Sequence, residues 1–133
     1  MLYFAYGSNL NHFQMKRRCK DSFFLKKINL KNFKLTFRSK YRAADIEPKK
    51  NSLVPGGLFE ISKSDEKKLD IYEDFPILYK KYYFFYYGKK VMTYTMVNKS
   101  SFKFPTERYL NIVKRGYKDC KLDKTYLNKA LKV

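Results

Sequence analysis

The pattern of apolar and polar residues predicts strands interspersed with short helices. Residues 2–6 form an apolar aromatic run that stops at Gly7-Ser8-Asn9, which is typical of a buried strand that ends in a tight turn. Gly7 can adopt a positive φ and let the backbone approach a ligand closely, and Ser8 or Asn9 can cap a following helix. The exposed N–H groups of such a turn favour a carboxylate or phosphate.

The helix expected after this turn spans residues 10–20. Its apolar residues Leu10, Phe13 and Met15 can face inward. The only histidine of the chain, His12, lies in this helix without a cysteine or carboxylate at a metal-ligand spacing. We therefore interpret it as a surface or capping residue.

Alternation in the middle of the chain predicts strands. The stretch 23–37 alternates most clearly at residues 31–37, and we expect two strands in it. Residues 38–52 are polar and are expected to form a loop with a brief extended piece at 43–46. The apolar stretch 53–61 reads as a strand, and its Pro55-Gly56-Gly57 indicates a bulge or a close backbone approach.

The second half of the chain predicts a hairpin and three helices. A helix begins at Ser62 or Ser64 and ends at Glu73. The aromatic strand 79–87 turns at Gly88 into a partner strand at 91–97. Apolar residues at helical spacing after Pro105 predict two terminal helices with a break near Gly116. Hairpins mixed with helices indicate an α+β fold, and no linker or repeat divides residues 1–133, so we expect a single domain.

Composition excludes several classes of protein. Hydrophobic residues make up 44% of the 133 residues, which excludes wholesale disorder, and no apolar run approaches the roughly 20 residues of a membrane span. We expect no membrane partner. The start of the chain lacks a signal-peptide pattern, which favours the cytoplasm. Cys19 and Cys120 match no metal spacing and are expected to be free thiols.

The formal net charge of +18 is the strongest compositional signal. Such a potential attracts nucleic acid, anionic membranes and acidic small molecules. However, 24 of the 30 basic residues are Lys, and they are scattered along the chain. A nucleic-acid groove would concentrate Arg and Lys on one element, so we expect no specific nucleic-acid partner.

Four later stretches follow the opening motif Tyr6-Gly7-Ser8-Asn9-Leu10 in a fixed order. They are residues 43–48 (AADIEP), 54–61 (VPGGLFEI), 69–73 (LDIYE) with Tyr79 beyond them, and 104–109 (FPTERY). With this order the chain resembles the gamma-glutamylcyclotransferase-like family, which includes the AIG2-like proteins. The resemblance covers nearly all of the sequence. It implies a small mixed, largely antiparallel β-barrel flanked by helices.

The resemblance also implies a chemistry. In this family the α-amine of a γ-glutamyl group attacks its own γ-carbonyl, which releases 5-oxoproline and a free amine or amino acid without a cofactor or metal. Such a protein is a transferase or lyase that acts on a small γ-glutamyl substrate. The pattern matches the family's catalytic glutamate at Glu73, which would serve as general base and then general acid.

The remaining site residues also follow from the resemblance. The loop Tyr6-Gly7-Ser8-Asn9-Leu10 would hold the glutamyl carboxylate, and Tyr79 and Tyr109 match pocket tyrosines. Asp74 departs from the family, where Gly often follows the catalytic glutamate; its charge could alter the titration of Glu73. Two alternatives stay open: a non-catalytic basic binding module of the same fold, and an interaction protein that regulates a partner. The sequence leaves the leaving group and the oligomeric state undetermined.

Overall fold

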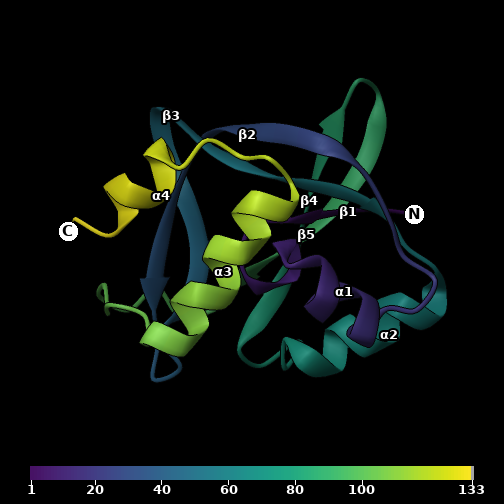
Figure 1. Ribbon diagram of the computed structural model, residues 1–133, viewed down its shortest axis with the longest axis horizontal. Helices are drawn as coiled ribbons and strands as arrows, with labels where there is room; N and C mark the ends of the chain where they lie inside the picture. The colour runs from purple at the N-terminus through teal and green to yellow at the C-terminus, as the bar shows by residue number, and fades with distance from the viewer. Residues whose placement is uncertain (133) are drawn as a thin grey trace.

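The structure is a computed structural model, and it describes residues 1–132. Five strands form one mixed sheet in the order β2-β3-β1-β5-β4. β1 is central: it pairs antiparallel with β3 and parallel with β5. Helices α1 and α3 lie in front of the sheet in Figure 1, α2 runs along its lower edge, and α4 packs against β2 and β3. The bounds are β1 Leu2–Ala5, α1 His12–Arg18, β2 Phe23–Arg38, β3 Ala43–Glu60, α2 Lys63–Tyr72, β4 Tyr79–Tyr86, β5 Lys89–Met96, α3 Glu107–Asp119 and α4 Thr125–Ala130.

The expected α+β class is confirmed, but the barrel is wrong. Within residues 1–132, β2 and β4 are the two edges of the sheet, and no hydrogen-bonded pairing joins them. The sheet is therefore open. A five-stranded sheet with a long twisted β2–β3 ribbon curls around its helices without closing, as Figure 1 shows.

The β2–β3 ribbon also corrects the expected loop. Residues 23–37 belong to one strand of 16 residues, and most of the polar stretch 38–52 belongs to the 18-residue β3. The two strands pair almost throughout, with register shifts between Phe24 and Lys26 and between Lys31 and Phe33. Polar residues were mistaken for a loop because the middle of this ribbon has solvent on both faces, so burial did not impose an apolar alternation.

The two glycines of β3 confirm a close backbone approach, although the expected bulge at Pro55-Gly56-Gly57 is absent from the continuous pairing there. A Cβ on Gly56 would lie 2.4 Å from the carbonyl oxygen of Ala5 and 2.4 Å from the ring of Phe4. Gly56 thus lets β1 pack tightly into the core.

The helix boundaries follow from their caps. Ser62 caps α2 and forms a capping box with Asp65, as its position in the sequence indicates.

The expected hairpin is confirmed as β4 and β5, joined through Tyr87 and Gly88, which both have positive φ. The two predicted terminal helices are present, but Gly116 lies inside α3 and the break between α3 and α4 comes after Asp119. A Cβ on Gly116 would lie 2.5 Å from Leu10 Cβ, and the glycine lets α3 cross the turn after β1.

The first helix differs from its prediction in two ways. A 3-10 helix, Ser8–Leu10, precedes α1, and Asn11 rather than Ser8 or Asn9 caps α1 by accepting a hydrogen bond from the Gln14 N–H. Leu10 and Met15 are buried as expected, whereas Phe13 is exposed. His12 packs its ring against Phe24 with 4.9 Å between ring centroids.

Both cysteines are buried and free, as predicted. In the part of the chain that the structure describes, none of the helices has the length and apolar character needed to cross a membrane.

Candidate active site

The turn after β1 brings the backbone against β3 and α3. Gly7 has φ −123°, so the positive φ expected there is wrong, but the close approach is present. A Cβ on Gly7 would lie 3.0 Å from Ala44 Cβ and 3.2 Å from the hydroxyl of Tyr109. The glycine is therefore required by space rather than by backbone conformation.

A pocket of about 440 Å³ opens beside this turn. Of the residues singled out by the sequence, it collects Tyr6, Gly7, Ser8, Asn9, Glu73, Tyr79 and Tyr109. Leu10 does not line the pocket, because its side chain is fully buried in the core. The pocket also includes Asp74, which the sequence singled out for its place beside Glu73, whereas the sequence analysis assigned no pocket role to the other lining residues: Tyr3, Tyr41, Ala43, Ala44, Ile71, Tyr72, Leu78 and Tyr94.

Glu73 follows the last turn of α2, and its backbone N–H donates to the carbonyl of Leu69. Its carboxylate faces the pocket, half-buried, and forms no hydrogen bond or ion pair with any side chain in residues 1–132. Burial raises the pKa of Glu73 to about 8, and the positive charge of Arg18 partly opposes this rise. A carboxyl with this pKa can both take up and return a proton near neutral pH.

Tyr79 and Tyr109 both form hydrogen bonds with the backbone of Ala44. The Tyr79 hydroxyl donates to the carbonyl of Ala44 at 2.6 Å, and the Tyr109 hydroxyl accepts from the N–H of Ala44 at 3.0 Å. Because a phenol has one proton, these bonds fix the role left to each hydroxyl. Tyr79 can only accept from a ligand, whereas Tyr109 still has its proton to donate.

Arg18 contacts two lining residues of the pocket from outside it. Its guanidinium lies 3.6 Å from the ring centroid of Tyr72 and donates to the side-chain oxygen of Asn9 at 2.8 Å. Asn9 in turn donates to the Tyr3 hydroxyl, and the Tyr72 hydroxyl shares a hydrogen bond of 3.0 Å with Ser8. The one sequence signal for this role was that Arg18 is among only six arginines in the chain.

Tyr6 also lines the pocket, and the proton of its hydroxyl is used in a hydrogen bond within the protein. Its hydroxyl donates to the carbonyl of Tyr94 at 2.7 Å, which ties the end of β1 to β5. The hydroxyl is thereby used within the protein.

Asp74 preserves the turn that a glycine would form. Its φ is +52°, in the left-handed region where glycine is favoured and Asp is tolerated better than most residues. Only burial and Arg18 shift the pKa of Glu73 appreciably, so the expected influence of the Asp74 charge on that pKa is not seen. Within residues 1–132, His, Cys, Asp and Glu side chains form no group of three that could hold a metal ion.

The family model for "Gamma-glutamyl cyclotransferase, AIG2-like" matches residues 3–115, which include every lining residue of this pocket. The chain belongs to this family. A comparison with curated proteins gives no match.

Several solved structures share the fold over nearly all of the chain. One described as a gamma-glutamyl cyclotransferase is 27% identical with a TM-score of 0.84, and the match covers 100% of this chain and 87% of that one. An uncharacterized protein from Homo sapiens is 28% identical with a TM-score of 0.83, covering 99% and 86% of the two chains. YkqA from Bacillus subtilis, 21% identical with a TM-score of 0.78, shares the fold over 97% of this chain and 52% of its own.

Proposed function

We propose that the protein is a γ-glutamyl cyclotransferase that releases 5-oxoproline and a free amine or amino acid from a γ-glutamyl amide. One observation carries the proposal beyond family membership. Glu73 places an unpaired carboxyl with a pKa of about 8 in a pocket of about 440 Å³, which is large enough for a small amide substrate.

The reaction needs a proton carrier and a binding site. The substrate α-amine enters mostly as an ammonium, and Glu73 in its carboxylate form takes one proton from it. The amine nitrogen then forms a bond to the γ-carbonyl carbon, and the electron pair of the carbonyl moves onto oxygen. As this tetrahedral intermediate collapses, Glu73 returns the proton to the leaving nitrogen and the bond to that nitrogen breaks. The Glu73 carboxylate then takes the second proton from the ring nitrogen, which gives the neutral 5-oxoproline amide, and passes it to the released amine, which leaves as an ammonium. Atoms, charge and protons balance within one substrate and one carboxyl group.

Intramolecular attack reduces what the protein must supply. Nucleophile and electrophile belong to the same molecule, and a well-oriented reaction of this kind reaches effective molarities on the order of 10⁵ to 10⁸ M. The main tasks are therefore to fold the glutamyl group into its attack geometry and to move the proton. No step in this sequence needs a cofactor or a metal.

The turn after β1 supplies donors for the charged parts of the substrate. No hydrogen bond within residues 1–132 uses the N–H groups of Ser8 and Asn9, at the start of the 3-10 helix. These donors suit the glutamyl α-carboxylate or the oxyanion on the γ-carbonyl. The free proton of Tyr109 can add a further donor, and the acceptor side of Tyr79 suits the ammonium.

The test is a screen of γ-glutamyl dipeptides, γ-glutamyl amines and glutathione for 5-oxoproline release by the purified protein. We expect at least one substrate class to react, with no change in rate on addition of EDTA. Loss of activity with EDTA that a divalent ion restores would contradict the metal-free mechanism. Failure of every substrate would favour the non-catalytic basic module of the same fold.

A further inference from the structure

A second cavity, of about 460 Å³, shares no lining residue with the active-site pocket. It lies between residues 34–38 of β2, residues 47–53 of β3, the segment 99–102 and helix α4. We call it the basic cavity. Its walls carry Lys34, Leu35, Thr36, Arg38, Glu47, Lys49, Ser52, Leu53, Lys99, Ser100, Ser101, Phe102, Tyr126, Lys129 and Ala130.

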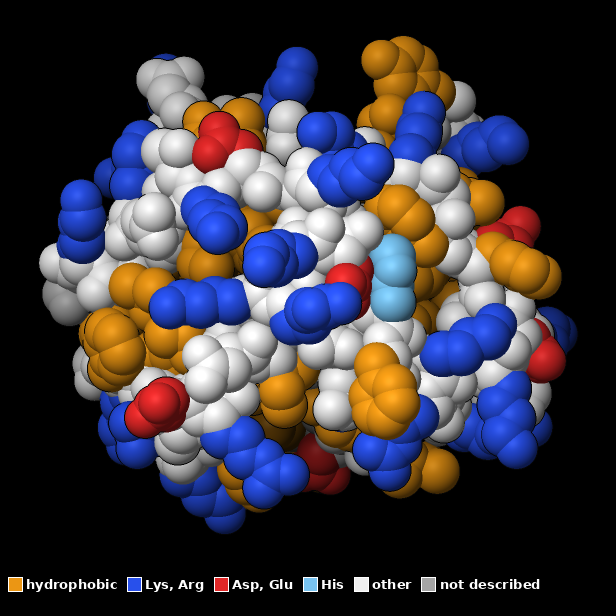
Figure 2. Space-filling view, in the orientation of Figure 1, with side chains coloured by type: hydrophobic (Ala, Val, Ile, Leu, Met, Phe, Trp, Pro, Cys, Tyr) orange, Lys and Arg blue, Asp and Glu red, His pale blue; other side chains and the backbone are white. Residues whose placement is uncertain are grey.

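Charge distinguishes the basic cavity from the rest of the surface. On the face shown in Figure 2, Lys and Arg side chains are scattered among neutral and apolar ones, as the sequence suggested. The basic cavity instead gathers five cationic side chains around one concave space, with Glu47 as the only acidic residue in its lining. Four of the five come from segments far apart in sequence, so the composition of any one stretch does not account for the cluster.

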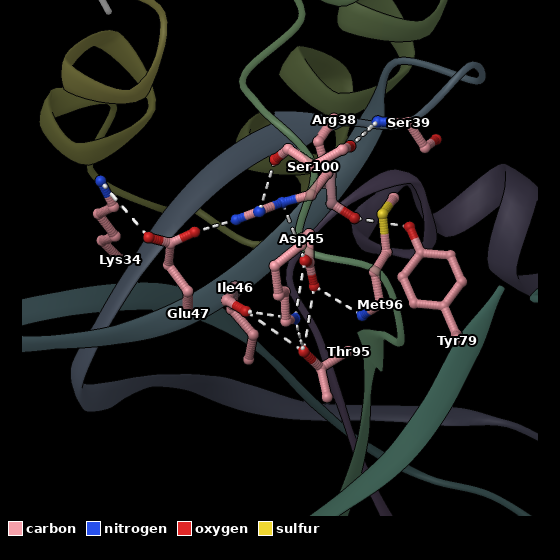
Figure 3. A network of polar contacts seen from close by, with 12 residues as sticks. Lys34, Arg38, Ser39, Asp45, Ile46, Glu47, Tyr79, Thr95, Met96 and Ser100 are labelled. Atoms are coloured by element: carbon pink, nitrogen blue, oxygen red, sulfur yellow. Dashed lines mark hydrogen bonds and ion pairs between the residues drawn. The ribbon is translucent and has the colours of Figure 1, made fainter.

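A rigid network holds one wall of the basic cavity in place (Figure 3). Arg38 is 4% exposed, donates to the carbonyl of Ser100 at 2.8 Å, and pairs with Glu47 and with Asp45. Lys99 lies 2.9 Å from the buried carboxylate of Asp45. These side chains have fixed positions before a ligand arrives, which lowers the entropic cost of binding.

Two cations of the basic cavity remain available. Lys49 and Lys129 are exposed, and neither lies within ion-pair distance of a carboxylate in residues 1–132. Lys129 lies only over the ring of Tyr126, at 5.2 Å from its centroid. Hydroxyl groups of Ser52, Ser100 and Ser101 are further donors in the same lining.

We propose that the basic cavity binds a small molecule that carries two or more phosphate groups. The volume lies in the range of small-molecule sites. Five cations against the carboxylates of Glu47 and of the adjoining Asp45 leave three positive charges, which a single carboxylate ligand would not balance. Lysines and hydroxyls around a fixed arginine are typical phosphate donors. This binding does not depend on the cyclotransferase activity.

The test uses inorganic tripolyphosphate as the probe and isothermal titration calorimetry at physiological salt. We expect one saturable site per chain. The double variant Lys49→Gln/Lys129→Gln should raise the dissociation constant at least about tenfold, since a hydrogen bond to a charged group contributes about 1.5–3 kcal/mol. Both lysines are exposed and unpaired, so thermal unfolding should be unchanged in this variant.

The matched control is Lys20→Gln/Lys118→Gln, which removes the same charge from two exposed lysines outside the basic cavity. We expect its dissociation constant to stay within about twofold of the wild-type value, because charges farther away than a Debye length are screened. Equal weakening in both double variants would mean that tripolyphosphate responds only to the overall charge and would overturn the proposal. So would the absence of saturable binding to the wild-type protein.

Discussion

Glu73 and Asp45 are two carboxylates that lie largely away from water in the same small domain, but they differ in their hydrogen-bond and ion-pair partners. Asp45 is fully buried and accepts hydrogen bonds from the Thr95 hydroxyl and the Met96 N–H, while Arg38 and Lys99 flank it (Figure 3). Glu73 has no such partner within residues 1–132, and its pKa rises to about 8.

The difference separates a structural carboxylate from a reactive one. Burying a charge is costly unless it is paired and hydrogen-bonded, and Asp45 meets both conditions. Glu73 meets neither, so its charged form is disfavoured and the group can exchange a proton near neutral pH. The complete set of partners around Asp45 makes that carboxylate unsuited to the role of base.

Asp45→Asn should produce the largest change in stability. The substitution leaves the buried guanidinium of Arg38 with less compensation, and breaking a buried pair in this way costs about 3–5 kcal/mol. Urea unfolding measures the loss. Glu60→Gln is the control, because Glu60 is an exposed partner of the N-terminus and should cost less than about 1 kcal/mol. Equal losses in the two variants would show that the Asp45 network contributes no stability.

Glu73→Gln should cut turnover at least about a hundredfold while the protein stays folded, since Gln is nearly isosteric and cannot take the proton. Release of 5-oxoproline measures the effect. The control Asp74→Asn removes a neighbouring pocket charge and suits the positive φ of that position, so it should retain turnover within a few-fold. If Glu73→Gln kept close to the wild-type rate, the assignment of the base would be wrong.

The pH dependence of the wild-type enzyme follows from the same group. Glu73 acts as a base in its carboxylate form, so kcat/KM should rise with pH through a pKa of about 8. The substrate ammonium also titrates, and the observed limb belongs to both groups. The stability of the folded protein should instead decrease with pH. Because the pKa of Glu73 in the folded state lies above the ordinary value of 4.5, the free energy of unfolding should fall as pH rises from 4.5 towards 8.

The variant Glu73→Gln tests this pH dependence of stability independently of catalysis. The variant has no charge to bury, so it should melt at a higher temperature than the wild type at pH 8, and the difference should vanish below about pH 4.5. Thermal unfolding across this pH range is the measurement. A constant difference at every pH would show that the carboxyl is solvated in the folded protein.

Tyr109→Phe should have a smaller effect on catalysis. It removes one of the donors available to the charged parts of the substrate, which we here assign to the glutamyl α-carboxylate, and a hydrogen bond to a charged group contributes about 1.5–3 kcal/mol. KM should rise about tenfold or more with kcat changed less, because the carboxylate is bound in both the ground state and the transition state. Tyr117→Phe is the control, since that buried tyrosine lies outside the pocket. A loss confined to kcat would contradict the carboxylate assignment.

Asp74→Gly should give the smallest change. Glycine relieves the left-handed backbone at φ +52° but adds freedom to the unfolded chain, so stability should shift by less than about 1 kcal/mol. Urea unfolding measures this shift. The pH limb of kcat/KM should not move, because Asp74 does not appreciably affect the pKa of Glu73. A displaced limb would show that the two carboxyls are coupled.

The sequence predicted those parts of the fold where burial or a cap leaves a local pattern. The central strand β1, the β4–β5 hairpin and the capped start of α2 at Ser62 are of this kind. It failed on residues 38–52, where pairing with β2 rather than burial makes a strand. Likewise, Gly116 has the composition of a helix break, and only its contact with Leu10 explains a glycine inside α3.

For the site, the family motifs predicted which residues meet in one pocket but not how they are bonded. Nothing local to Tyr79 or Tyr109 indicates that both hydroxyls bind the peptide of Ala44. Arg18 was missed for the same reason, since its contacts with Tyr72 and Asn9 depend on the packing of α1 against α2. Such contacts form between residues that are distant in the sequence, so they leave no periodic pattern in the sequence itself.

The contact between Gly7 and Ala44 makes the two positions epistatic. A methyl group added at residue 7 would meet the existing methyl of Ala44 at 3.0 Å, so each position limits the size of the other. Directed evolution that varies residue 7 alone should therefore recover glycine. A swap of the two side chains, Gly7→Ala with Ala44→Gly, removes this contact but leaves the added methyl group 3.2 Å from the Tyr109 hydroxyl, so a redesign of this wall of the pocket has to include residue 109 as well.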